Sequence, residues 1–231
     1  MHTSSSNQSY RLVFNEATGT WVAAPETARG RGKAGRLARR LLLAAAHTGA
    51  APIVGGQGLP QTPTPVGDRY LVTTSPDGNL MQIKQSSNQS RAVIDWTSFS
   101  IAKGKRVEFL QDYPWYMALN RVTGSAASLI EGELMSQGKI FLVNPNGIVF
   151  SGSAKVDTAG LLATTLNVSD ANANAFKFSG AALAFTMEGS GTAVINEGEL
   201  TGRTGAHLAL VGPKVINSGT IAGDGGHVQL L

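Results

Sequence analysis

An internal repeat in the last third of the chain limits the folds that are open to it. Residues 194–200 (Val-Ile-Asn-Glu-Gly-Glu-Leu) recur as residues 215–221 (Val-Ile-Asn-Ser-Gly-Thr-Ile), about 21 positions later, and residues 129–134 form a more distant copy. A repeat of this length is one structural unit that buries its apolar face by stacking on its neighbours. The Leu-x-x-Leu-x-Leu pattern of a leucine-rich horseshoe is missing. Short β segments at this period therefore predict a parallel β-helix.

The residue types of the repeat suit one coil of such a helix. Inward-pointing Val, Ile and Leu stack along the axis, glycine permits a tight bend, and a corner asparagine can hydrogen-bond its copy in the next coil. Asn196 and Asn217 are candidates for this corner position. The predicted fold class is all-β, a right-handed parallel β-helix with an N-terminal β cap and little helix. Residues 70–83 are placed to form the cap, and residues 170–176, with Ser169 or Asp170 as N-cap, form one plausible helical turn.

A turn of unusual composition interrupts the β-rich run of residues 140–150. The run alternates apolar residues with the two-residue period of strands, while Asn144-Pro145-Asn146-Gly147 places four turn-forming residues in its middle. Proline presets φ for a turn and glycine supplies positive φ, so the chain must bend there. An ordinary structural turn is one interpretation of this segment.

Other motifs arrive in a fixed order around this turn. They are residues 85–87 (Gln-Ser-Ser), 91–101 (Arg-Ala-Val-Ile-Asp-Trp-Thr-Ser-Phe-Ser-Ile), 107–109 (Val-Glu-Phe), 120–124 (Asn-Arg-Val-Thr-Gly) and 159–165 (Ala-Gly-Leu-Leu-Ala-Thr-Thr). In this order they resemble the N-terminal secretion (TPS) domain of the filamentous haemagglutinin family of two-partner secretion exoproteins and adhesins. The resemblance covers about residues 65–231 and is closest to the subgroup found in high-molecular-weight adhesins.

The resemblance implies that the domain directs export of its own polypeptide across the outer membrane. The implied partner is a dedicated outer-membrane transporter whose periplasmic domains recognise the chain, and the host-cell surface is a further candidate partner. Carried over to matching positions, the recognition role falls on Asn120, Arg121, Asn144, Pro145, Asn146 and Gly147. We expect Asn144 to lie at the surface, so that Asn144→Ala blocks export without changing stability. The implied location is outside a Gram-negative bacterium or on its surface, reached through the periplasm.

The N-terminal part has the composition of a targeting region. Residues 9–26 resemble the extended signal-peptide region of large exoproteins, and a basic cluster ending at Arg40 precedes the apolar run 41–46. That run is too short for a stable membrane span, which needs on the order of 20 residues; a short amphipathic helix is the alternative. Residues 55–65, rich in Gly and Pro, are expected to be a linker.

We therefore predict two parts. Residues 1–60 comprise the extended signal-peptide region, the signal sequence and linker, and residues 61–231 form the secretion domain. The last repeat stops partway through at Leu231, so we expect the chain to be a fragment, a truncated gene product or the start of a longer protein.

Charge and cysteine content exclude several functions. Seven of the 19 basic residues but two of the 15 acidic residues lie in the first 40 positions, which leaves the rest of the chain nearly neutral. A nucleic-acid-binding domain would carry its basic excess on the folded part, so no nucleic-acid partner is expected. The absence of cysteine removes disulfides, thiolate nucleophiles and cysteine-based metal sites.

The remaining residues give little support for catalysis. His207 and His227 occupy matching repeat positions, which repeat geometry explains better than an active site, and no Gly-x-Ser-x-Gly motif is present. We expect no enzyme activity, no catalytic residue, no metal and no cofactor. Two alternatives stay open: a free-standing extracellular adhesin, and a polysaccharide-degrading enzyme built on a β-helix.

Overall fold

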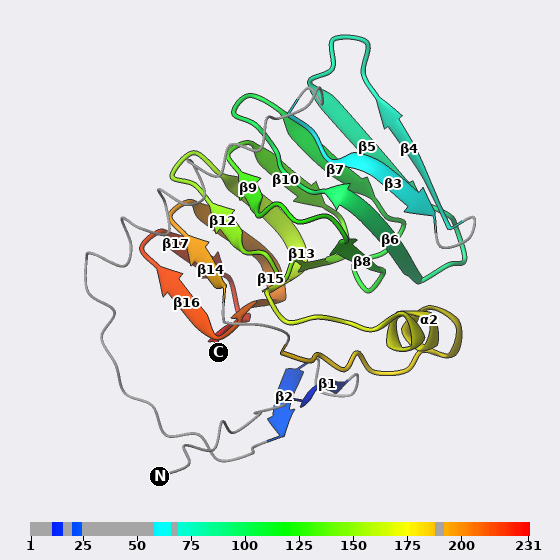
Figure 1. Cartoon of the computed structure of the whole chain (residues 1–231), viewed down its shortest axis with the longest axis vertical. Helices are drawn as coiled ribbons and strands as arrows, with labels where there is room; N and C mark the ends of the chain where they lie inside the picture. The colour runs from blue at the N-terminus through cyan, green and yellow to red at the C-terminus, as the bar shows by residue number, and fades with distance from the viewer. Residues whose placement is uncertain (1–10, 16–19, 25–57, 66–68, 188–191) are drawn as a thin grey trace.

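The computed structural model describes residues 11–15, 20–24, 58–65, 69–187 and 192–231 (Figure 1). Within these ranges strands dominate, and from residue 80 onward they wind into a parallel β-solenoid. The predicted β-helix is therefore confirmed. Near the N-terminus, β1 (Arg11–Asn15) and β2 (Thr20–Ala24) form an antiparallel pair. The predicted signal run 41–46 lies outside the described residues.

The solenoid has three faces, and each coil contributes a strand or half-strand to them in turn. The first face holds β5 (Leu80–Gln85), β7 (Arg106–Leu110), β10 (Glu133–Ser136), β17 (Thr220–Gly223) and the first halves of β13 (Lys155–Thr164) and β15 (Glu199–Val211). The second holds β6 (Arg91–Ser98), β8 (Met117–Val122), β11 (Lys139–Val143), β18 (His227–Leu230) and the second halves of β13 and β15. The third holds β9 (Ser128–Ile130), β12 (Ile148–Phe150), β14 (Ala193–Asn196) and β16 (Lys214–Asn217).

Stacked aliphatic side chains form the central core. On the first face, parallel register places Val107, Leu134, Val156 and Leu200 above one another, and all four are buried. Because each strand points alternate side chains inward, one such ladder removes a full row of apolar surface from water. The corner asparagines also behave as predicted, since Asn196 Nδ2 donates to Asn217 Oδ1 at 2.8 Å.

The repeat length varies along the solenoid. The 21-residue spacing applies to the last coils, whereas the register pairs Gln82–Glu108 and Arg106–Glu133 are 26 and 27 residues apart. Longer corner loops account for the difference, because the stacked strands themselves keep their register. A search of the sequence for a fixed 21-residue repeat therefore does not detect the earlier coils.

A second apolar core lies on the outer side of the second face. Between β13 and β14 the chain leaves the solenoid and forms α2 (Asp170–Ser179), whose Phe176 packs with Leu119, Phe141 and Leu162. Ser169 is the N-cap, and its hydroxyl accepts a hydrogen bond from the backbone of Asn172. The predicted helical turn is thus confirmed and extends three residues further. Among the described residues, no helix has the length and apolarity needed to cross a bilayer.

Antiparallel strands cap the N-terminal end of the solenoid. β4 (Tyr70–Thr74) pairs with β5 on the first face, as predicted, and β3 (Gln61–Pro65) pairs with β6 on the second face. The linker predicted for residues 55–65 is therefore wrong for residues 58–65, where Leu59 is buried in the core. Prolines are tolerated in β3 because it is an edge strand, in which a missing N–H costs no ladder bond.

Candidate functional site

The six predicted recognition residues gather at one corner of the solenoid, between the second and third faces. Asn120 and Arg121 lie in β8, and the turn 144–147 follows β11, which is the neighbour of β8 in register. A cleft of about 480 Å³ opens at this corner, lined by Arg121, Val122, Thr123, Gly124, Val143, Pro145, Asn146, Asn167, Val168, Ser169 and Asp170. Three of the six predicted residues, Arg121, Pro145 and Asn146, therefore line the cleft, and the other three do not.

Asn144 is the structural centre of the turn. Its side-chain Nδ2 donates to the carbonyl of Ala126 and to Ser128 Oγ, both at 3.0 Å, and its Oδ1 accepts from the backbone N–H of Asn146 at 3.0 Å. The side chain is fully buried. The expected surface location of Asn144 is therefore wrong, because the side chain satisfies backbone groups of the adjacent corner instead of facing solvent.

The rest of the turn is hydrogen-bonded to two neighbouring segments. Asn146 Nδ2 donates to the Gly124 carbonyl at 2.8 Å, and the Pro145 carbonyl accepts from Thr192 Oγ1 at 2.6 Å. Gly147 has φ of +118°, a conformation that L-residues with a Cβ rarely adopt. The glycine requirement predicted from the sequence is thus real at this position.

Asn120 occupies a core position on the second face. Its register neighbours Ile94 and Leu142 are buried aliphatic residues, so Asn120 places an amide in an otherwise apolar ladder. Its Oδ1 accepts from the Trp96 indole Nε1 at 3.0 Å, and its Nδ2 donates to the Ala118 carbonyl at 3.1 Å. Since these bonds satisfy the buried amide and the indole together, Asn120 serves as a structural partner of Trp96 in the folded chain.

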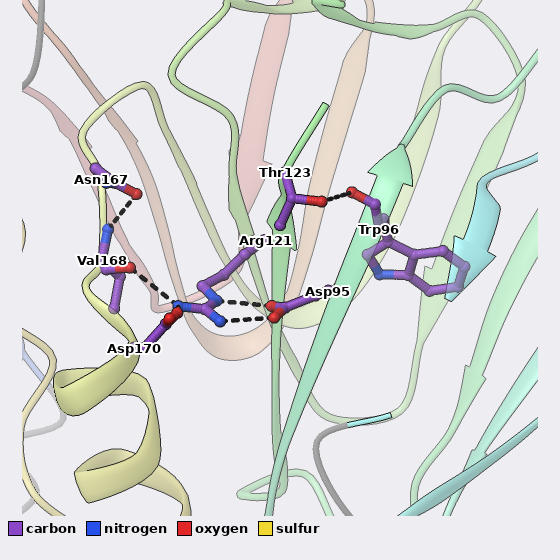
Figure 2. A network of polar contacts seen from close by, with 7 residues as sticks. All are labelled: Asp95, Trp96, Arg121, Thr123, Asn167, Val168 and Asp170. Carbon is purple, nitrogen blue, oxygen red and sulfur yellow. Dashed lines mark hydrogen bonds and ion pairs between the residues drawn. The ribbon is translucent and has the colours of Figure 1, made fainter. Parts of the chain in front are cut away.

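Arg121 points to the opposite side of the strand and forms the charged wall of the cleft (Figure 2). Its Nε and Nη2 each donate to one carboxylate oxygen of Asp95 at 2.7 Å, a bidentate pair across neighbouring strands. Its Nη1 donates to the Val168 carbonyl at 3.1 Å and to Asp170 Oδ1 at 2.8 Å. One guanidinium therefore connects two coils to the start of α2.

The environment of Arg121 favours the charged form. Burial lowers the pKa of the guanidinium, but hydrogen bonds and charges from Asp95, followed by Asp170, outweigh it and raise the pKa above its ordinary value. Side-chain exposure is 10% for Arg121 and 18% for Asp95, but 89% for Asp170. The Asp95 contact is thus the one that solvent screens least.

Sequence reasoning missed the partners of the predicted residues. Asp95, Val168 and Asp170 complete the Arg121 cluster, and the backbone carbonyl of Trp96 accepts a hydrogen bond from Thr123 (Figure 2). The Trp96 indole also pairs with Asn120. Asp95 and Arg121 are 26 residues apart, one early coil length. A 26-residue repeat would have predicted this pairing from the sequence. The repeat that is visible in the sequence, in the last coils, has 21 residues and does not predict it.

The histidines that share repeat positions also meet in space. The rings of His207 and His227 stack with centroids 4.9 Å apart. Burial, followed by the charges of His227 and Lys139, lowers the pKa of His207. In the described part of the chain, no group of three or more metal-ligating side chains forms around them or elsewhere.

Comparison with known proteins places this geometry in a family. Residues 57–231 match the family model of the TPS secretion domain, and residues 7–55 match the model of the Extended Signal Peptide of Type V secretion system. A heme/hemopexin-binding protein of Haemophilus influenzae is 37% identical over 195 residues, covering 82% of this chain and 21% of that protein. A second H. influenzae protein of the same name is 44% identical over 100 residues. The chain thus spans about a fifth or less of these relatives.

A solved structure agrees with the sequence matches. The crystal structure of the HMW1 secretion domain from H. influenzae superposes with a TM-score of 0.64 at 33% sequence identity, covering 74% of this chain and 44% of that one. This solved structure is a secretion domain, the class of domain that the motifs of the sequence resembled. The family is defined by secretion and not by an enzymatic reaction. The chain therefore belongs to the TPS secretion domains of two-partner secretion exoproteins.

Proposed function

We propose that this domain is recognised by a cognate outer-membrane transporter, which exports the polypeptide that carries it. Membership of the TPS family supports the transporter as partner, and the extended signal peptide match supports prior entry into the periplasm of a Gram-negative cell. The proposal divides the chain into a targeting part with its linker, residues 1–60, and a secretion domain, residues 61–231, whose core also includes Leu59. It places the exported protein in the medium or on the cell surface and assigns no catalytic role.

The observation that carries the proposal is the contrast in exposure among the six recognition residues. Pro145 and Asn146 line an open cleft and are partly exposed, whereas Asn120 and Asn144 are fully buried and Arg121 is mostly buried. A partner can contact the first group in the folded domain, but it can contact the second group only before the coils close. The proposal is therefore that recognition begins on the unfolded chain in the periplasm.

Backbone pairing provides a physical route for such recognition. An extended segment can add a strand to the edge of a partner's sheet, where main-chain hydrogen bonds supply affinity and alternate side chains supply specificity. The segments 117–122 and 139–143 are β-forming in sequence and bear the recognition motifs at their ends. After export the same residues turn to their structural roles in the solenoid.

Stacking of coils outside the cell is then the source of free energy for export in this proposal. Each newly folded coil adds one buried aliphatic residue to a ladder such as Val107, Leu134 and Val156, which favours forward movement of the chain. Disruption of an outer ladder should therefore slow export without changing recognition.

The test is export by the complete chain. Residues 1–231 are expressed with and without a cognate outer-membrane transporter, and the medium and periplasm are analysed by immunoblot. Transporter-dependent appearance in the medium is the expected result. Retention of a folded domain in the periplasm despite the transporter would overturn the proposal.

A further inference from the structure

The loop between β7 and β8 carries an exposed group of aromatic side chains far from the recognition turn in sequence. Tyr113 and Trp115 are 47% and 56% exposed, and their rings stack with centroids 4.4 Å apart and planes at 15°. Tyr116 lies beneath them, buried, with its ring 5.4 Å from that of Tyr113. These three residues, 113, 115 and 116, are called the aromatic shelf.

The shelf is held firmly by the solenoid corner. Gln111, buried at the start of the loop, donates from Nε2 to Gln85 Oε1 at 2.9 Å and accepts the backbone N–H of Gly138 at 2.9 Å. Pro114 presets the backbone for the turn, which closes with the Tyr116 N–H donating to the Tyr113 carbonyl at 3.1 Å. The stacked rings are therefore presented in a fixed orientation and do not depend on a mobile loop.

Polar groups border the shelf. Asp112 is exposed at its N-terminal side, and the neighbouring loop exposes Ser87 and Asn88. That loop is in contact with the shelf, because the backbone N–H of Asn88 donates to Tyr116 Oη at 3.2 Å and the Met117 N–H donates to the Ser90 carbonyl at 2.8 Å. Flat aromatic surface is thus combined with an exposed carboxylate in the same loop and with exposed amide and hydroxyl residues in the loop that contacts it.

We propose that the aromatic shelf is a binding site for a neutral sugar ring of a glycan. A pyranose presents C–H groups on its faces and hydroxyls around its edge, so it can stack on the exposed ring face of Trp115 while Asp112 and Asn88 bond its hydroxyls. The pair of half-exposed rings offers on the order of 200 Å² of apolar surface. A stable protein interface needs about 1,000 Å² or more, so the shelf is large enough for one or two sugar units and too small for a protein partner.

The test uses the purified full chain and three neutral probes, lactose, maltotriose and chitotriose. Affinity is measured for the wild-type chain and every variant by isothermal titration calorimetry, and heteronuclear NMR shifts of the Trp115 indole in the wild-type chain locate the binding. At least one probe should give saturable shifts. Both Trp115→Ala and Tyr113→Ala should weaken the affinity for that probe about tenfold or more. Trp115→Phe retains a ring and should keep part of the affinity. Phe178→Ala, which removes another strongly exposed aromatic ring on α2, should leave it unchanged.

Two results would overturn the proposal. One is the absence of saturable shifts with every probe, and the other is equal affinity in Trp115→Ala and the wild-type chain. Thermal unfolding of each variant verifies the fold, since these exposed rings contribute little to the core. Export of Trp115→Ala through the transporter should match the wild-type level, which separates this site from the recognition role. Loss of export together with absent sugar binding would assign the shelf to the transporter instead.

Discussion

The two walls of the cleft are held together by different forces. The turn 144–147 relies on neutral amide hydrogen bonds that reach one corner away, to Ala126, Ser128 and Gly124. The Arg121 wall relies on a buried charge that links strands 26 residues apart and a helix 49 residues away. The comparison teaches that the turn wall needs only the adjacent coil, whereas the Arg121 wall also needs α2, which lies 49 residues further along the chain.

Removing the charge at the assembled wall should have the largest effect. In Arg121→Met the Asp95 carboxylate, which is 18% exposed, and the Val168 carbonyl lose their partner. The cost of leaving a buried charge unpaired is about 3 to 5 kcal/mol, and we expect a loss toward the lower end of this range. Urea unfolding at neutral pH measures the loss. The matched control is Arg106→Met, whose bridge to Glu133 is solvent-exposed and should contribute less than about 1 kcal/mol. Equal losses in the two variants would contradict the account of the charged wall.

Removing the amide at the turn should have the next largest effect. Asn144→Ala leaves the buried carbonyl of Ala126 and the hydroxyl of Ser128 without this donor, which costs about 1 to 3 kcal/mol. The loss should be insensitive to salt, in contrast to a contribution from charge. The measurement is urea unfolding at low and high salt. An unchanged free energy of unfolding would restore the surface location first expected for this residue.

The backbone of the same turn gives a smaller effect. Gly147→Ala meets no steric clash, since the nearest atom to the added Cβ is Ala127 Cβ at 3.5 Å, so its cost comes from φ of +118° alone. We expect about 1 to 2 kcal/mol by thermal or urea unfolding. Gly152→Ala is the control, because its site is open and its φ lies outside the positive range. A neutral Gly147→Ala would show that positive φ is not what the turn requires.

The smallest effect concerns charge in the last coils, where nothing equivalent to Arg121 is found among the described residues. The pKa of His207 lies below its ordinary value of 6.5, so the unfolded chain binds more protons than the folded chain just below that pH. Stability from this group is complete above 6.5 and is lost as the pH falls. His207→Gln should flatten the decline in unfolding free energy between about pH 7.5 and pH 5.5. An identical pH profile in the variant would exclude this contribution.

Much of the fold could be predicted because its determinants repeat or are local. The copies at 194–200 and 215–221 indicated the stacked coils, and the asparagine corner and the cap at Ser169 appear where their residue types predicted. The motif Asn144 to Gly147 likewise indicated a turn with a positive-φ glycine. Each of these depends on residues within one coil or on a direct copy.

The remainder depends on contacts that only assembly creates. Burial of Asn144 follows from the adjacent corner at 126–128, and the Arg121 cluster follows from α2 packing over the second face. Residues 61–65 form the strand β3 only because β6, about 30 residues later in the chain, pairs with them. In each case the sequence contains the residues but not the distance between them, because coil length varies along the chain.

The central claim is that the recognition residues act in export apart from their role in stability. It is tested most directly by measuring transporter-dependent export of two variants with similar losses of unfolding free energy. These are Asn144→Ala in the turn and Val156→Ala, a buried aliphatic change in the ladder of the first face. We predict that Asn144→Ala accumulates in the periplasm, whereas Val156→Ala, which keeps the recognition residues, still reaches the medium, although more slowly than the wild-type chain. Equal export of the two at equal stability would contradict the claim and leave the turn a purely structural feature.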